Sequence, residues 1–178
     1  RGDNKVLTSN SNGAGTWEYA PVAFSFASST ATTIGTSTGT TTRFRAVIPS
    51  GMFAANSAIK IDVNGNATGE SSSQVLMVVL RAGVGGSAVF DTNPVLNMKD
   101  CGSGISMSLT IANRNATNSQ VLTGMRNQGD GTCGIISHVP ETAALTTAGN
   151  DVHVEVQTRN FAGTGTFRLD SIVVTLIP

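Results

Sequence analysis

The chain has 178 residues, with 11 basic and 11 acidic side chains and a formal net charge of zero. Charged residues make up 12% of it, against about 25% in a typical soluble domain. A neutral chain without a basic stripe lacks the positive charge that nucleic-acid binding requires, and no apolar run approaches the ~20 residues of a membrane span. We therefore expect one polar domain that neither binds nucleic acid nor inserts into a membrane.

Apolar residues alternate with polar ones in a series of short segments, which is the pattern of strands with one buried face. In chain order, these segments are 22–26, 44–48, 59–63, 105–111 and 152–156. No long window repeats apolar residues at the three- and four-residue spacing of a helix. In the last segment His153 occupies a polar position between valines, so we expect it to face solvent.

Two further segments depart from simple alternation. The sequence LMVVL at 76–80 is apolar throughout, which predicts a strand buried on both faces. In the final segment the apolar positions change parity after Leu169. Either a bulge near Asp170 and Ser171 or a central strand that is apolar on both faces would explain this change, and we favour the bulge.

Stretches rich in Gly and Asn separate these segments and predict turns, among them VNGNATG at 63–69 and NQGDGT at 127–132. The Thr-rich span 28–42 favours an exposed β-ribbon over a long loop, because Thr prefers extended backbone. About eight to ten short strands between such turns predict an all-β fold. We expect an antiparallel two-sheet sandwich of jelly-roll topology.

The sequence carries no recognisable catalytic apparatus. His138 and His153 lack a carboxylate or cysteine partner at motif spacing. The stretch Asp62–Asn66 resembles the opening of a calcium loop but lacks its closing Glu. Cys101 and Cys133 permit either free thiols or one disulfide. We therefore expect a protein that is not an enzyme and that needs no cofactor or metal.

The opening stretch KVLTSNSNGAGTWEY, at 5–19, resembles a segment common in bacteriophage tail fibres. That segment reads approximately G-K/Q-V-L-T-S, then a few small residues, then T-W. Val6, Leu7, Thr8 and Ser9 match its first part, and Thr16-Trp17 matches its second. In such fibres the segment links the stalk to the next module.

A second stretch, 47–90, is similar to a β-sandwich module of phage fibres. The module reads I-P-A-G-x-L/F-x-x-N-x-x-I-x-I, followed later by a strand that ends in R-x-G-G. The matching residues are Ile48, Pro49, Gly51, Phe53, Asn56, Ile59, Ile61, Arg81 and Gly83. The resemblance implies the terminal knob of a tail fibre or related virion appendage, which is exposed on the virion, forms a homotrimer and attaches to a host or virion surface.

On this interpretation residues 1–20 are the link from stalk to knob, and residues 21–178 are the β-sandwich knob. Near a three-fold axis, Val6, Leu7 and Trp17 of three chains would pack together at the subunit interface. The alternative is that Trp17 covers the end of its own sandwich.

A receptor, either a host-surface glycan or a protein, is expected to contact loop tips, because loops vary while the sandwich holds them. The candidate residues carry amide, carboxylate or guanidinium groups that suit sugar hydroxyls: Asn113, Arg114, Asn115, Asn127 and Asp130. Other virion proteins are further expected partners. Two alternatives stay open, a structural head-fibre or decoration protein and a carbohydrate-binding module of a secreted enzyme. The low aromatic content of 5% disfavours the second.

Overall fold

A computed structural model describes residues 5–9, 15–19, 22–27, 32–34, 40–69, 74–83, 88–91, 104–128, 134–160 and 165–177. Side chains are described within 40–65, 78–83, 106–125, 142–158 and 169–177. The described residues form thirteen strands: β1 (Lys5–Ser9), β2 (Gly15–Tyr19), β3 (Val22–Ala27), β4 (Thr32–Ile34), β5 (Thr40–Ile48), β6 (Ala58–Gly69), β7 (Gln74–Ala82), β8 (Ala88–Asp91), β9 (Gly104–Asn113), β10 (Gln120–Gln128), β11 (Gly134–Ala143), β12 (Val152–Asn160) and β13 (Gly165–Ile177). Across these ranges no helix is long and apolar enough to cross a membrane.

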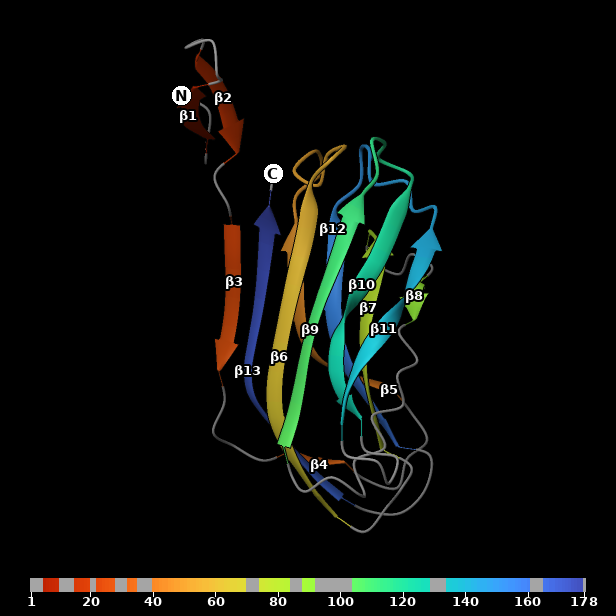
Figure 1. Cartoon of the computed structure of the whole chain (residues 1–178). Coiled ribbons are helices and arrows are strands. Elements are labelled where there is room, and N and C mark those ends of the chain that lie inside the picture. The colour runs from red at the N-terminus through yellow and green to blue at the C-terminus, as the bar shows by residue number, and fades with distance from the viewer. Residues whose placement is uncertain are drawn as a thin grey trace.

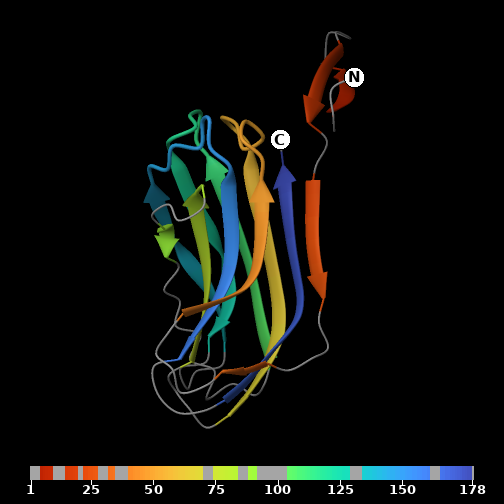
Figure 2. The same ribbon diagram turned by 180° about the vertical axis from the view of Figure 1, so that it is seen from behind.

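The strands form two facing sheets and a separate hairpin (Figure 1). The large sheet has seven strands, in the order β11-β10-β9-β6-β13-β3, with β4 also paired to β13. The small sheet has four, in the order β5-β12-β7-β8, and it faces the viewer in Figure 2. β1 and β2 pair only with each other. The sandwich sequence therefore begins at β3, after the hairpin.

The order of pairing defines the fold. β3 pairs with β13, β5 with β12, β6 with β9 and β7 with β8, so that each pair encloses the next along the chain. Successive pairs lie alternately in the large and the small sheet. This is an antiparallel ribbon rolled into two layers, a jelly roll. The predicted all-β, two-sheet antiparallel sandwich is confirmed, and the β10–β11 hairpin widens its large sheet beyond β9.

The core lies between the sheets and consists of the inward members of the alternating segments. They include Ile59, Ile61, Val63, Met107, Leu109, Ile111, Val152, Val154, Val156, Ile172, Val174 and Leu176, all buried. Burying one such aliphatic side chain contributes about 1.5–3 kcal/mol. The alternation therefore fixes which face of each strand points inward.

Two local predictions about strands are confirmed. Val78, Val79 and Leu80 are consecutive and all buried, as expected of a strand covered on both faces. The register of β13 against β6 shifts between Leu169 and Ser171, which is the predicted bulge. In the Thr-rich span, the described residues 32–34 and 40–42 are extended, and Thr40–Thr42 are exposed.

The predicted turn at VNGNATG is wrong, because β6 continues unbroken from Ala58 to Gly69. Gly65 pairs with Leu169 on one side and Ile105 on the other. A strand between two partners satisfies backbone hydrogen bonds on both edges, whereas a turn at this point would leave the neighbouring strands unpaired. The bulge opposite, in β13, absorbs the local irregularity.

Candidate functional site

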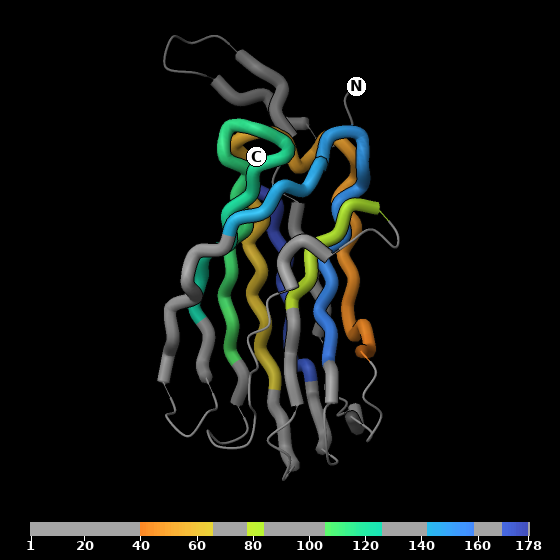
Figure 3. Tube along the Cα trace, turned by 90° about the vertical axis from the view of Figure 1, so that its right-hand side faces the viewer, coloured from red at the N-terminus to blue at the C-terminus, as the bar shows by residue number. Residues whose placement is uncertain are grey.

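Three loops, 49–57, 114–119 and 144–151, gather at one end of the sandwich, seen at the top of Figure 3. β3 also begins at this end, because Val22 pairs with Leu176, which pairs with Ile59. We call it the entry end. The opposite or far end is where β6 reaches Gly69 and β10 reaches Gln128.

A buried polar network fixes the entry-end loops to one another. Gln120 accepts a hydrogen bond from the Leu145 N–H at 2.7 Å and donates to the Leu145 carbonyl at 3.0 Å and to Asn113 Oδ1 at 2.8 Å. Asn113 Nδ2 in turn donates to the carbonyls of Phe53, at 3.1 Å, and Ala54, at 2.7 Å. Gln120 also donates to the Thr117 carbonyl at 3.3 Å, so two buried amide side chains connect all three loops. Their own amide groups are satisfied by protein partners.

Backbone and hydroxyl contacts extend this network. Thr147 donates through its N–H to the Thr117 carbonyl at 2.9 Å and through Oγ1 to the Phe53 carbonyl at 3.2 Å. The Asn115 N–H donates to Asn56 Oδ1 at 3.1 Å, and both asparagines have positive φ, 58° and 66°. Asn tolerates this backbone region better than most residues. The three loops are therefore hydrogen-bonded to one another and do not form independent tips.

A second polar cluster lies on the outer face of the small sheet, centred on Glu155 of β12. Arg45 Nε on β5 lies 2.8 Å from Glu155 Oε1, and Arg81 Nε on β7 lies 3.3 Å from Oε2. Gln157 also donates to Oε2. The Glu155 side chain is only 3% exposed. Its negative charge is compensated by two arginine side chains from the flanking strands, as a buried charge requires.

The surroundings of Glu155 keep it ionised. Burial by itself would raise the pKa of Glu155, but the hydrogen bond from Gln157, the charge of Arg45 and the hydrogen bonds of both arginines outweigh it. The pKa therefore lies below its ordinary value of 4.5. A carboxylate held in this way cannot supply a proton at neutral pH, so the cluster does not provide a general acid.

The expectation that His153 faces solvent is wrong. His153 is 3% exposed, and its Nδ1 has no hydrogen-bond partner among the described residues. The reason is that β12 lies between β5 and β7, so that His153 stands between Val47 and Arg81. Long side chains on the neighbouring strands cover the outer face of an inner strand, which alternation along one strand does not reveal.

The lowered pKa of Glu155 predicts a dependence of stability on pH. A carboxyl group whose pKa is lower in the folded state stabilises the fold above its unfolded pKa, near 4.5, and loses this contribution as the pH falls through the folded value. We expect Glu155→Gln to lower the denaturation midpoint at pH 7, and the difference from wild type to shrink progressively below about pH 4.5. Urea titrations at pH 7, 5, 4 and 3 measure this, and a difference that grows in acid would contradict it.

The structure separates the residues that the sequence proposed for receptor contact. Arg114 and Asn115 are exposed at the entry end, whereas Asn127 lies on β10 near the far end, opposite Ile135. Asn113 is buried and its side chain is used internally, so we remove it from the set. Asp130 lies outside the described residues. Cys101 and Cys133 also lie outside them, so free thiols and one disulfide stay as the two alternatives for this pair.

Sequence reasoning missed both polar clusters. Gln120 gave no signal, since one Gln after a polar loop is unremarkable, and its partners come from loops distant in sequence. For the second cluster a signal existed: Arg43 and Arg45 at alternate positions of one strand, and Glu155 between valines of another. Of the described His, Cys, Asp and Glu residues, no three gather where they could hold a metal ion.

The fold defines a jelly-roll sandwich, the class to which viral capsid and lectin domains belong. The comparisons with solved structures give only distant similarities. The structure of the Gx strain of infectious bursal disease virus is similar at 12% identity and a TM-score of 0.37, over 99% of this chain and 38% of the viral chain. The VP2 subviral particle of the same virus is similar at 15% identity and a TM-score of 0.38, over 92% of this chain and 35% of the viral chain. Peanut lectin is similar at 12% identity and a TM-score of 0.43, over 89% of this chain and 99% of the lectin.

No protein-family model and no curated protein sequence matches the chain. The chain spans little more than a third of the length of the viral chains. At these identities and TM-scores the similarity carries no argument about this chain, and any functional proposal rests on the residues of the chain itself.

Proposed function

We propose that this chain is the knob of a virion appendage, such as a bacteriophage tail fibre, and that it attaches the virion to a glycan or protein on the host surface without catalysing a reaction. One observation carries the proposal. The fibre-like segment at 5–19 forms a hairpin that pairs with neither sheet, and the jelly roll begins directly after it, at Val22. This is the arrangement expected where a stalk passes into a knob.

The position of β3 supports one orientation of the proposed knob. The chain enters the sandwich at the entry end, so a stalk joined through residues 1–20 would lie on that side, and the far end would point toward the host. Arg114 and Asn115 are at the entry end, while Asn127 is near the far end. We therefore propose Asn127 and Asp130, rather than Arg114 and Asn115, as receptor contacts.

Binding of labelled protein to a panel of bacterial cells and to a glycan array tests this proposal. We expect adsorption to at least one cell type, and a loss of about tenfold or more when Asn127 and Asp130 are both replaced by alanine, since lost polar contacts of about 1.4 kcal/mol reduce affinity tenfold. The matched control, Arg114→Ala with Asn115→Ala, should bind as wild type. Adsorption lost only in the control pair would reverse the orientation, and silence on every cell and glycan would remove the receptor role.

The homotrimer is the second part of the proposal. In the hairpin Leu7 pairs with Trp17 and Lys5 with Tyr19, while Val6 pairs with Glu18. Directly paired residues belong to one face of an antiparallel ribbon, so Leu7 and Trp17 form the proposed contact near the three-fold axis and Val6 belongs to the other face. An isolated two-stranded hairpin is marginally stable in water, and association of three would stabilise it. Three knobs held in one trimer would also attach to a surface more firmly than a single knob, because several weak contacts act together.

Light scattering coupled to size-exclusion chromatography tests the trimer. We expect a mass of three chains for the wild type and a shift toward monomer for Trp17→Ala, because truncating a buried aromatic anchor at an interface costs at least about 2 kcal/mol. Glu18→Ala, on the other face of the hairpin, should remain trimeric. A monomeric wild type would contradict the trimer, and an unchanged Trp17→Ala trimer would support the alternative that Trp17 covers its own sandwich.

A further inference from the structure

Asn64 and Gly65 form an Asn-Gly pair within β6, an inner strand of the large sheet. In an unfolded chain such a pair deamidates readily, because glycine has no side chain to hinder its own backbone nitrogen. That nitrogen attacks Asn64 Cγ, its proton leaves with the side-chain amino group as ammonia, and a succinimide ring forms. Water then adds to one of the two ring carbonyls and breaks its bond to nitrogen, which gives aspartate or isoaspartate.

Pairing on both sides holds the backbone at this point extended. Asn64 and Gly65 are each paired with one residue of β13 and one residue of β9. Closing the succinimide ring requires the Asn64 backbone to rotate out of the extended conformation. That rotation would turn the peptide group between the two residues away from both neighbouring strands and break its ladder hydrogen bonds. Gly65 is also buried. The folded strand therefore opposes the first step of the reaction.

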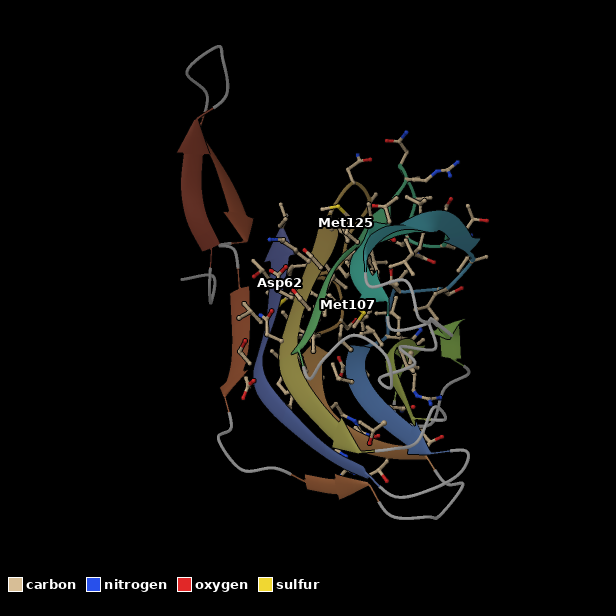
Figure 4. All side chains as sticks on the ribbon, turned by 60° about the horizontal axis from the view of Figure 1, so that its bottom comes forward. Asp62, Met107 and Met125 are labelled. Atoms are coloured by element: carbon tan, nitrogen blue, oxygen red, sulfur yellow. The ribbon has the colours of Figure 1, made fainter. Side chains whose placement is uncertain are left out.

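The Asn64 side chain is exposed to water but is held across the sheet. In Figure 4 the side chain of Asp62, two residues earlier on β6, projects away from the core, and Asn64 belongs to the same face of the strand. Asn64 Oδ1 accepts a hydrogen bond from Ser106 at 3.1 Å, and Nδ2 donates to Ser171 at 3.2 Å. Water therefore reaches the carboxamide, and what limits the reaction is the geometry of the backbone.

The β9 side of the pair is more regular than the β13 side. The bulge in β13 lies directly opposite, since the register shifts between Leu169, which faces Gly65, and Ser171, which faces Asn64. A bulge disrupts the ladder locally. Toward β9, however, the register of β6 is unbroken from Ala58 to Asn66. Opening at the bulge alone leaves the pair held by β9, so the reaction requires β6 to leave both partners.

We propose that Asn64-Gly65 is a deamidation site that the fold keeps closed and that unfolding of the large sheet opens. The proposal goes beyond the proposed function and does not depend on it. Isoaspartate lengthens the backbone of β6 by an additional carbon. An inner strand cannot shift against one partner without losing its register with the other, so a chain with isoaspartate at position 64 should not regain the native sheet. Unfolding that lasts long enough for the reaction would thus become irreversible.

Deamidation rates of the full chain at neutral pH, measured in buffer and in a series of urea concentrations across the unfolding transition, test the proposal. Peptide mapping by mass spectrometry locates the product, and enzymatic methylation of isoaspartate quantifies it. We expect Asn64 to react at least about 100-fold more slowly in the folded protein than in the unfolded chain, because only the small open fraction reacts. Between these limits the rate should follow the unfolded fraction. The other Asn-Gly pair of the sequence, Asn12-Gly13, is the internal standard in the unfolded chain.

Two variants separate the causes. Ser106→Ala combined with Ser171→Ala removes the side-chain bonds of Asn64 but keeps the pairing of β6, so the rate should be unchanged when compared at the same unfolded fraction. Asn64→Gln lacks the fast-reacting pair. After prolonged incubation in urea and dilution, this variant should refold fully, whereas the wild type should lose native protein in proportion to its isoaspartate content.

Each contrary result overturns a stated part of the proposal. Equal rates in the folded and unfolded chain, or a slow reaction in both, would show that the fold does not control this site. A slow rate in the folded protein that stays constant as urea increases toward the transition would mean that local opening at the bulge is sufficient. A faster reaction of the double serine variant at equal unfolded fraction would assign the protection to the side-chain bonds. Refolding of isoaspartate-containing wild type to the level of Asn64→Gln would remove the irreversible step.

Discussion

Replacing Gly124 by alanine is expected to lower the free energy of unfolding by at least about 3 kcal/mol, because overpacking between two backbones has no flexible side chain to relieve it. Gly124 lies on β10 where the register against β11 shifts, and it pairs with Leu109 of β9. A Cβ at this position would lie 2.7 Å from Leu109 Cδ2 and 2.8 Å from Leu109 Cα, and closer still to the Ser108 carbonyl oxygen. The strands β9 and β10 would have to separate locally.

Gly51→Ala is the matched control. Gly51 has a positive φ of 84°, and a Cβ there would have no atom within 4 Å. Its cost is then only the backbone preference, about 1–2 kcal/mol. Urea denaturation at one fixed protein concentration measures both variants. Equal losses for the two would show that the close approach of β9 and β10 at Gly124 does not matter.

The second large effect is expected for Gln120→Met, which keeps the volume of the side chain and removes its amide. The Leu145 N–H and carbonyl and Asn113 Oδ1 would lose their hydrogen bonds to Gln120 inside the protein. Each unsatisfied buried group costs about 1–3 kcal/mol, with partial relief from rearrangement or water. We expect a loss of about 2–4 kcal/mol in the free energy of unfolding, together with faster hydrogen exchange of the Leu145 amide.

Asn150→Ala is the control for burial. Asn150 Nδ2 also donates to two carbonyls, of Thr146 at 3.2 Å and Ala148 at 3.4 Å, but it is exposed. Water can replace these bonds, so the change should stay within about 0.5 kcal/mol. A Gln120→Met variant as stable as Asn150→Ala, with unchanged exchange at Leu145, would mean that the entry-end loops are held by their apolar residues, such as Phe53, rather than by the amide network.

Both predictions concern residues that no local pattern marks. Gly124 is one of 20 glycines, and Gln120 one polar residue in a polar chain. Their importance comes from partners on other strands, Leu109 across the sheet and Leu145 on a different loop. The same holds for His153, whose burial depends on the neighbours of β12 in the sheet order.

The sequence by itself determined the class of fold and the inward face of the strands. Alternating residues such as Ile59, Ile61 and Val63 bury one side because apolar burial is the dominant favourable term, and this term depends only on residue type and spacing. The change of parity after Leu169 favoured a bulge over a strand that is apolar on both faces, because one extra residue exchanges the two faces of a strand, and the register shift confirms it.

Only the tertiary structure decided the rest. The nested pairing of the strands places Arg114 at the entry end and Asn127 near the far end. The sheet order also brings Arg45, Arg81 and Glu155 together from three strands. It also kept VNGNATG extended as the second half of β6, where two partner strands favour extended backbone over a turn. Hydrogen bonding and close contact between strands depend on register and sheet order, which no single segment of the chain encodes.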